Sequence, residues 1–224
     1  MPPLLLTVLT VLAVLAVAAS AVGAMAAAYR GDRRGVYLFK PLTTVLIIVA
    51  TLWLFAPAMR RYQEVVLLGL ALSLAGDVFL MLPGNRFLFG LASFLAAHLA
   101  YIWAFTLGVG YEAAQLPWLA PFAFFGVMVV VVLWRGLHGA ALKGAVVAYV
   151  AAIVAMAWRA AVRGHSPLLP YPSVVLALAG ACLFLASDSI LAIDRFRRPF
   201  RAAQSLVLAS YWAAQLLIGL SVRA

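Results

Sequence analysis

The stretch SLAGDVFL, residues 73–80, places one acidic side chain, Asp77, within an apolar run of about residues 63–82. About 20 consecutive apolar residues are enough for a helix to cross a bilayer. A charge near the centre of such a helix costs about 2.5 kcal/mol or more, so acids in these positions usually serve a function. A second acid, Asp188, lies in the similar stretch LASDSIL, residues 185–191. The sequence therefore predicts a membrane protein with two functional intramembrane carboxylates.

The composition excludes a soluble protein. Of the 224 residues, 67% are hydrophobic and 10% are charged, whereas a soluble domain is about half apolar and about a quarter charged. The apolar segments run continuously instead of alternating with polar residues, which favours helices over a β-barrel. We therefore expect an all-α, polytopic membrane protein.

The net charge of +10 comes from 16 basic and 6 acidic residues. Most of the basic residues lie in short loops between apolar segments, where they contact anionic lipid headgroups and determine orientation. We therefore expect membrane lipid as a partner and no nucleic acid. The single cysteine, Cys182, excludes an internal disulfide and any multi-cysteine metal site.

Eight apolar segments are expected to form transmembrane helices joined by tight loops, with Pro and Gly at their junctions. The first segment has no basic n-region and is too long for the core of a signal peptide, so we expect it to be retained. No linker is long enough to hold a soluble domain, and residues 1–224 form one integral membrane domain. The expected spans are residues 4–28, 39–56, 63–82, 87–109, 117–134, 140–162, 172–193 and 201–221.

The basic residues also predict the orientation. The loops after odd-numbered spans carry 11 of the 16 basic residues, and the opposite side carries 5. Because basic loops stay in the cytoplasm, both termini are expected on the other side. The Ala- and Arg-rich composition is typical of bacteria, so we expect the bacterial inner membrane.

A weak internal repeat relates the two acidic stretches. LAGDVFL at 74–80 aligns with LASDSIL at 185–191, and a span carrying a tyrosine follows each, with Tyr101 in one and Tyr211 in the other. The two copies fall in spans 3–4 and 7–8, which have the same orientation. This pattern suggests two four-helix halves related by an axis along the membrane normal.

Polar groups from several spans are expected at similar depths. Asp77 lies about five residues from the cytoplasmic end of its span, roughly 7–8 Å at 1.5 Å per residue, and Asp188 is at a comparable depth. We expect one polar cavity, open towards the cytoplasmic leaflet, that gathers these acids with groups from spans 2, 4 and 8. The further candidates are Lys40, at the start of span 2, and Ser73, His98, Tyr101, Tyr211 and Gln215.

Structural roles for these residues remain alternatives. Asp77 and Asp188 could each be satisfied by Ser, Tyr or Lys40 on a neighbouring helix, and Lys40 could extend to the lipid headgroups. His98 could be a hydrogen-bonded core residue, and Tyr211 and Gln215 could join helices. Two acids and one histidine can bind a metal ion, but their spacing does not require it, so we predict no metal and no cofactor.

Five motifs together resemble the YhhN-like family, and the resemblance covers nearly the whole chain. The individual motifs are short, but their order and spacing are fairly specific. They are KP at 40–41, SxxGD at 73–77, FxxGxxxFxxxHxxY at 87–101, SDxxLA at 187–192 and YxxAQ at 211–215.

The animal members of this family are lysoplasmalogenases, so the resemblance implies hydrolysis of the vinyl ether bond of a lysophospholipid. The products would be a fatty aldehyde and glycerophospho-ethanolamine or -choline. Protonation of a vinyl ether gives an oxocarbenium ion that water captures, and two carboxylates in different environments serve such chemistry in glycosidases. We therefore expect Asp77 and Asp188 to be this pair, without assigning which of them is the acid, and expect His98 and Tyr101 to position water or the enol oxygen. Lys40, Ser73, Tyr211 and Gln215 are the expected substrate-binding residues. Of these, Lys40 is expected to hold the phosphate headgroup together with Arg residues on the cytoplasmic side.

Two other functions are compatible with the same residues. A metal-assisted lipid hydrolase could use Asp77, Asp188 and His98 as ligands. A proton- or cation-coupled transporter could use the two acids as a relay between its halves, since transporters also combine intramembrane acids with internal repeats.

Overall fold

The computed structural model describes residues 3–54, 57–84 and 86–223, and within these ranges the regular structure is entirely helical. Eight helices of this part of the chain are long and apolar enough to cross a membrane, which confirms the predicted all-α polytopic fold. Four short 3-10 turns lie in the connections, at Pro57–Met59, Ala113–Trp118, Trp134–Gly136 and Arg163–His165. The long helices are α1 (Pro3–Arg30), α2 (Arg33–Trp53), α3 (Arg60–Met81), α4 (Phe87–Thr106), α5 (Leu119–Leu133), α6 (Ala140–Val162), α7 (Tyr171–Phe196) and α8 (Ala203–Leu220).

The second helix begins earlier than the hydrophobicity predicts, and this corrects the position of Lys40. The side chain of Asp32 accepts a hydrogen bond from the backbone N–H of Arg34 and caps the helix there. Pro41 is accommodated inside α2, so it does not mark a helix start. Lys40 therefore lies about two turns within α2 and not at its beginning. The predicted end of this span at residue 56 lies outside the described residues.

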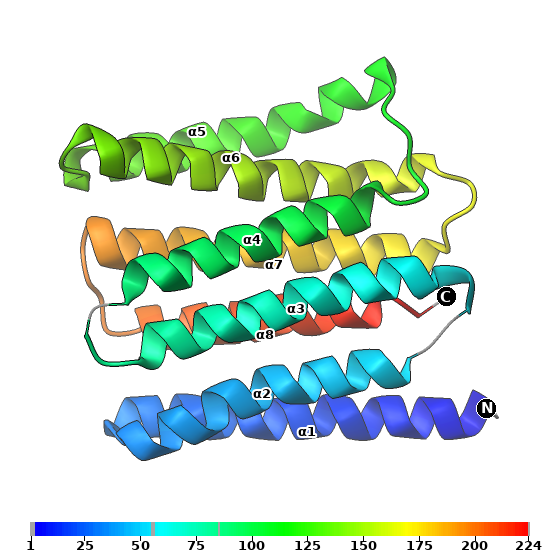
Figure 1. Cartoon of the computed structure of the whole chain (residues 1–224), viewed down its shortest axis with the longest axis horizontal. Coiled ribbons are helices and arrows are strands. Elements are labelled where there is room, and N and C mark those ends of the chain that lie inside the picture. Colours follow the sequence, from blue (N-terminus) through cyan, green and yellow to red (C-terminus); the bar gives the residue numbers. More distant parts are fainter. Residues whose placement is uncertain (1–2, 55–56, 85, 224) are drawn as a thin grey trace.

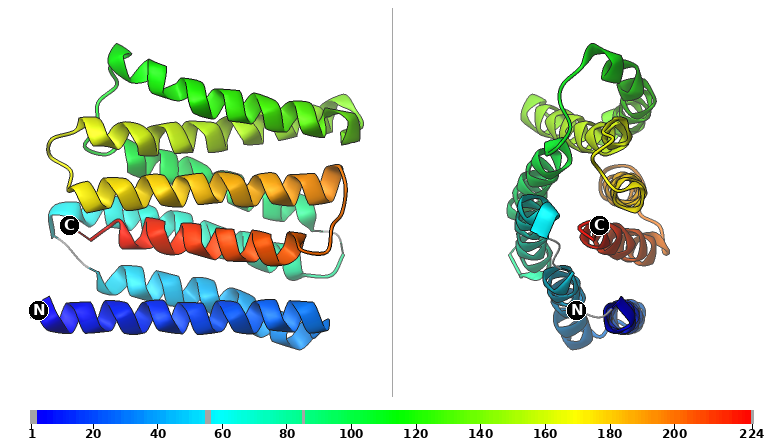
Figure 2. Two further views of the ribbon diagram at one scale, coloured as in Figure 1. Left: turned by 180° about the vertical axis from the view of Figure 1, so that it is seen from behind. Right: turned by 90° about the vertical axis from the view of Figure 1, so that its right-hand side faces the viewer.

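Two layers of roughly parallel or antiparallel helices make up the molecule (Figures 1 and 2). One layer contains α2, α3 and α4, and the other contains α1, α8 and α7, with α5 and α6 at one edge. The chain crosses the molecule from α1 to α4 and returns from α5 to α8 (Figure 1). The return brings α8 against α1, α2 and α3, helices from the other end of the chain.

The packing partners repeat between the two halves of the chain. The pair α3 and α4 packs extensively, as does the pair α7 and α8. Helix α4 also packs against α6 of the other half, and α8 correspondingly packs against α2. The match is incomplete, because α1 contacts α8 whereas α5 contacts α7. The two four-helix halves suggested by the sequence repeat thus have similar internal packing, and α3 and α7 occupy corresponding places.

Glycine allows the closest approach of helices within each half. A Cβ atom added to Gly69 of α3 would collide with the ring of Tyr101 on α4. A Cβ added to Gly180 of α7 would lie 2.7 Å from Cγ1 of Ile218 on α8. Small residues permit this tight packing of membrane helices, which brings the polar side chains of α3, α4, α7 and α8 together.

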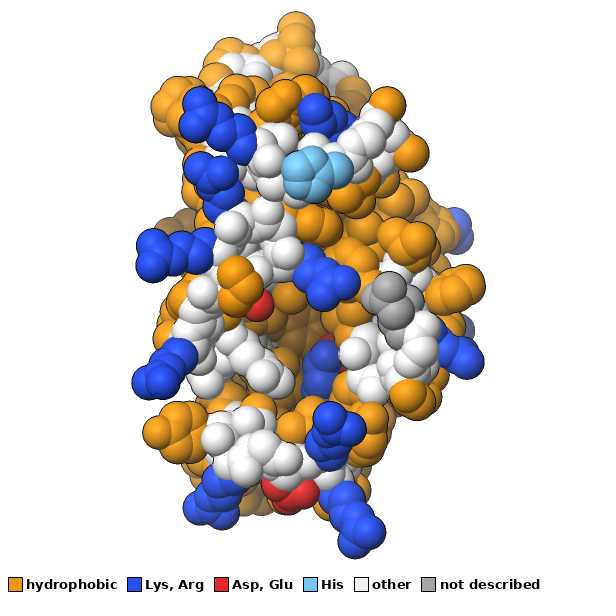
Figure 3. All heavy atoms as spheres, turned by 90° about the vertical axis from the view of Figure 1, so that its left-hand side faces the viewer, with side chains coloured by type: hydrophobic (Ala, Val, Ile, Leu, Met, Phe, Trp, Pro, Cys, Tyr) orange, Lys and Arg blue, Asp and Glu red, His pale blue; other side chains and the backbone are white. Residues whose placement is uncertain are grey.

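The connections α1–α2, α3–α4, α5–α6 and α7–α8 all lie at one end of the molecule (Figure 1). This basic end is hollowed near its centre, and Lys and Arg side chains surround the hollow (Figure 3). The structure therefore places the basic connections around the entrance to the interior.

Candidate functional site

A cavity of about 610 Å³ penetrates the molecule from the basic end. Its walls come from α1, α2, α3, α4, α7 and α8 and from the connection between α1 and α2. Both intramembrane acids line it, Asp77 from α3 and Asp188 from α7. The polar or charged side chains around the cavity are those of Asp32, Arg33, Tyr37, Lys40, Asp77, Ser187, Asp188, Asp194, Gln204 and Tyr211.

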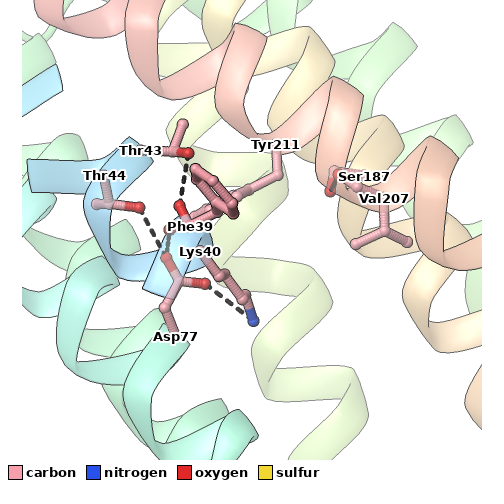
Figure 4. Close-up of polar contacts among 8 residues, drawn as sticks. All are labelled: Phe39, Lys40, Thr43, Thr44, Asp77, Ser187, Val207 and Tyr211. Carbon is pink, nitrogen blue, oxygen red and sulfur yellow. Dashed lines mark hydrogen bonds and ion pairs between the residues drawn. The ribbon is translucent and has the colours of Figure 1, made fainter. Parts of the chain in front are cut away.

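Three donors from two other helices surround Asp77 (Figure 4). Lys40 Nζ lies 3.2 Å from Asp77 Oδ1, and the Asp77 side chain is 2% exposed. The other oxygen, Oδ2, accepts hydrogen bonds from Thr44 Oγ1 at 2.9 Å and from the Tyr211 hydroxyl at 2.8 Å. Hydrogen bonds and a nearby cation favour the ionised form of a carboxyl group. Asp77 is thus buried, but its carboxylate is bound by three donors.

Asp188 has a different environment. Its Oδ2 accepts a hydrogen bond of 2.6 Å from the Tyr149 hydroxyl of α6. Nε2 of His98, on α4, lies 3.6 Å from the same oxygen, which is too far for a hydrogen bond in this state. The Asp188 side chain is 14% exposed, whereas His98 is fully buried. Asp188 is therefore open to the cavity and has a histidine beside it where Asp77 has a lysine.

Aromatic rings pack against a neighbour of each acid. The Phe184 ring of α7 packs edge-on against His98, with 4.8 Å between centroids, and against Tyr211 at 5.5 Å. Phe94 of α4 also packs edge-on against Tyr211, at 5.7 Å, and lines the cavity. These rings hold His98, beside Asp188, and Tyr211, which binds Asp77, in place.

The structure places the candidate residues in two groups. Lys40 and Tyr211 both contact Asp77 at the cavity, and Asp188 lies in the same cavity with His98 beside it. The remaining candidates, Ser73, Tyr101 and Gln215, are fully buried and are not among the cavity-lining residues. The Tyr101 hydroxyl donates to Gln215 Oε1 at 2.6 Å and thereby joins α4 to α8.

Sequence reasoning missed two residues of the site. Thr44 lies one helical turn after Lys40, so the i, i+4 spacing on α2 could have identified it. Tyr149 stands in an apolar helix without a motif around it, and only the packing of α6 on α7 reveals its contact with Asp188.

No group of three or more His, Cys, Asp or Glu side chains within the described ranges is arranged to hold a metal ion. The arrangement instead presents two carboxylates with different partners on the walls of one cavity. Such a pair can divide the tasks of proton donor and proton acceptor.

Comparisons with known proteins agree with this architecture. Residues 35–222 match the model of the YhhN family. The chain is 28% identical over 198 residues to the uncharacterized membrane protein YhhN of Escherichia coli O6:H1, covering 86% of this chain and 89% of that protein. It is 32% identical over 185 residues to the human lysoplasmalogenase TMEM86B, covering 79% and 71% of the two chains.

The pig lysoplasmalogenase TMEM86B is 37% identical over 151 residues, which cover 67% of this chain and 59% of that protein. No solved structure gives a significant match. The family match spans α2 to α8 and includes both acids and all their partners described above. The chain therefore belongs to the YhhN family.

Proposed function

We propose that this protein is a membrane-embedded hydrolase that cleaves the vinyl ether bond of lysoplasmalogens. The products are a fatty aldehyde and glycerophospho-ethanolamine or -choline. The observation that carries the proposal is the placement of Asp77 and Asp188 on the walls of one cavity. Relatives named lysoplasmalogenase, at 32% and 37% identity, support this choice of substrate.

The surroundings of the two acids suggest how they divide the chemistry. Asp77 has a lysine and two hydroxyl donors, which suit a carboxylate that stays ionised. Asp188 has one hydroxyl donor and a histidine at 3.6 Å, so it is better suited to carry a proton. We assign Asp188 as the general acid and Asp77 as the carboxylate that activates water.

The reaction then proceeds in two stages. Asp188 transfers its proton to the alkenyl carbon that is β to the ether oxygen, and the adjacent carbon and oxygen become an oxocarbenium ion. Asp77 stabilises this cation and removes a proton from water as the water oxygen bonds to the cationic carbon. In the second stage the hemiacetal O–H returns its proton to Asp188, and the glycerol oxygen leaves with the proton held by Asp77. One water is consumed, and both acids regain their starting states.

The neighbouring residues hold these two acids in place. Tyr149 positions Asp188 through its hydrogen bond, with His98 packed beside it, while Thr44 and Tyr211 position Asp77. Lys40 was expected to bind the phosphate, but its Nζ is already bound to Asp77. Arg33, which lines the same cavity, is the better candidate for that contact. Ser73, Tyr101 and Gln215 support the site from behind.

The basic end of the molecule is proposed to face the cytoplasm of a bacterial cell. The cavity would then receive its substrate from the cytoplasmic leaflet of the inner membrane. The concentration of basic residues around the cavity entrance supports this orientation (Figure 3).

The test is aldehyde release from lysoplasmalogen by purified protein in proteoliposomes. Replacing a general acid or base typically costs about 10²–10⁴-fold in rate, and we expect losses of this size for Asp77→Asn and Asp188→Asn. Glu64→Gln is the matched control, because Glu64 is an exposed acid on the same helix as Asp77 and pairs with Arg60 at the surface. Full activity in both aspartate variants would refute the two-carboxylate mechanism.

A transporter remains the second candidate, because the acids lie on corresponding helices of two similarly packed halves. The same proteoliposomes distinguish the two functions. Uptake of a cation or proton without any aldehyde release would favour the transporter, whereas aldehyde release without uptake would favour the hydrolase.

A further inference from the structure

A second, apolar cleft adjoins the cavity on the far side of Asp188. It lies between α4, α5, α6 and α7, and its enclosed volume is about 50 Å³. Apart from Asp188, Ser189 and the Tyr149 hydroxyl, the side chains that line it are apolar. They are Phe87, Leu91, Val129, Leu133, Val146, Val150, Ile153, Leu185, Leu191, Ala192 and Phe196, with Gly126 completing the wall.

Asp188 and Leu191 line both the cavity and the cleft. The surroundings change from polar to apolar across these two residues, because most of the charged groups of the site line the cavity alone. Tyr149, which donates to Asp188, faces the cleft. The carboxyl group assigned as the acid therefore stands at the boundary between a polar and an apolar compartment.

The cleft is narrow but extended. Its lining on α7 runs from Leu185 to Phe196, which corresponds to roughly 16 Å along a helix at 1.5 Å per residue. Near the basic end, the rings of Phe87 and Phe196 meet edge-on at 6.1 Å between centroids, and the Arg195 guanidinium lies over Phe87 at 4.9 Å. These side chains bound the cleft on the side of the lipid headgroups.

We propose that this cleft binds the alkenyl chain of the substrate, so that the vinyl ether lies at Asp188 with the glycerophosphate in the cavity. This inference rests on the proposed function and deepens it. A lysoplasmalogen changes from polar to apolar at the vinyl ether, and the protein changes in the same way at Asp188. Burial of the chain against these side chains favours binding.

The first test narrows the cleft and measures selectivity for chain length. Val150 lines the cleft on α6, whereas Val147 on the same helix is 43% exposed and does not line it. Val150→Phe should lower kcat/KM for long alkenyl chains about tenfold more than for short ones, since one misplaced methylene can change selectivity by this factor. Val147→Phe is the matched control and should keep the wild-type profile. An equal loss at every chain length in Val150→Phe, or the same loss of selectivity in Val147→Phe, would overturn the proposal.

The second test does not depend on turnover. A saturated alkyl ether lysophospholipid lacks the vinyl bond and can carry a photoreactive group at the end of its chain. Cross-links in the wild-type protein should map to cleft residues of α5 and α6, such as Val129 and Val146, and should weaken in Val150→Phe. Cross-links confined to the outer, lipid-facing surface would contradict the subsite even if the protein releases aldehyde. Cross-links in the cleft without aldehyde release would refute the proposed reaction and retain the chain-binding site.

Discussion

Lys40 and Asp77 form a buried ion pair between α2 and α3, and the lysine side chain is 12% exposed. Each charge makes the other tolerable in an apolar bundle, because removing one partner leaves an uncompensated charge. The same pair is also part of the proposed catalytic machinery. Its structural and catalytic contributions can be separated, since stability depends on charge balance and activity depends on the carboxylate.

Lys40→Met should therefore destabilise the protein by about 3 kcal/mol, because Asp77 loses its cation. Adding Asp77→Asn should restore most of this stability without restoring aldehyde release. Thermal unfolding in detergent, measured beside the activity assay, checks both effects. A double variant that is no more stable than Lys40→Met would contradict this interpretation of the pair.

Tyr149→Phe removes only the hydroxyl that donates to Asp188. As Asp188 gives up its proton it becomes a carboxylate, and the Tyr149 hydroxyl stabilises this developing charge. A hydrogen bond to a charged group contributes about 1.5–3 kcal/mol, so we expect kcat to fall by about tenfold to a hundredfold. One limb of the pH–rate profile should move, whereas KM should change little. Tyr171→Phe is the control, because Tyr171 is 79% exposed at the start of α7. An unchanged pH–rate profile would indicate that Tyr149 does not act through Asp188.

At the scale of helices, the close packing of α3 on α4 also connects these two helices to α8. The absence of a side chain at Gly69 lets the ring of Tyr101 lie directly against α3. Tyr101 in turn binds Gln215 of α8, so three helices are joined behind Asp77. The buried tyrosine and glutamine thus support the site without lining the cavity.

Gly69→Ala should cost about 1–3 kcal/mol, because the added methyl overpacks a tight contact. Gly144→Ala is the matched control within α6, where a Cβ meets no atom within 4 Å. In a helix alanine is more favourable than glycine by up to about 1 kcal/mol, so this variant should be neutral or stabilised. Thermal unfolding in detergent compares the stability of the two variants. Equal stability would show that the close approach of α3 to α4 does not require a glycine at position 69.

At the scale of the whole molecule, the four basic connections share one end of the bundle with the cavity entrance. The orientation of the protein in the membrane therefore also determines from which leaflet the substrate enters. If the basic end is cytoplasmic, the cavity receives lipid from the cytoplasmic leaflet.

Cysteine labelling tests this orientation in a Cys182→Ser background. Ala202→Cys lies in the α7–α8 connection at the basic end, and Leu168→Cys lies between α6 and α7 at the opposite end, where the leucine is 84% exposed. A membrane-impermeant maleimide added to intact spheroplasts should label Leu168→Cys only. Inverted vesicles should show the reverse, and labelling of Ala202→Cys in spheroplasts would contradict the orientation.

The sequence by itself determined the class of protein, the eight spans and the two acids. Continuous apolar runs have one stable arrangement in a bilayer, and an acid within such a run is conspicuous. The motif pattern also singled out Lys40, His98 and Tyr211. The start of α2 could not be judged from hydrophobicity, because the cap at Asp32 extends the helix through polar residues.

Only the tertiary structure decided which partners each acid has and where the apolar cleft lies. A helix that is apolar on every face shows little periodicity of hydrophobic residues in its sequence. Its rotation about its own axis and its neighbours therefore depend on packing with distant parts of the chain. For this reason Tyr149 was unmarked in the sequence, His98 came to lie beside Asp188, and Lys40 was bound to Asp77. The composition of each helix establishes that it crosses the membrane, but the fit between helices establishes which side chains meet.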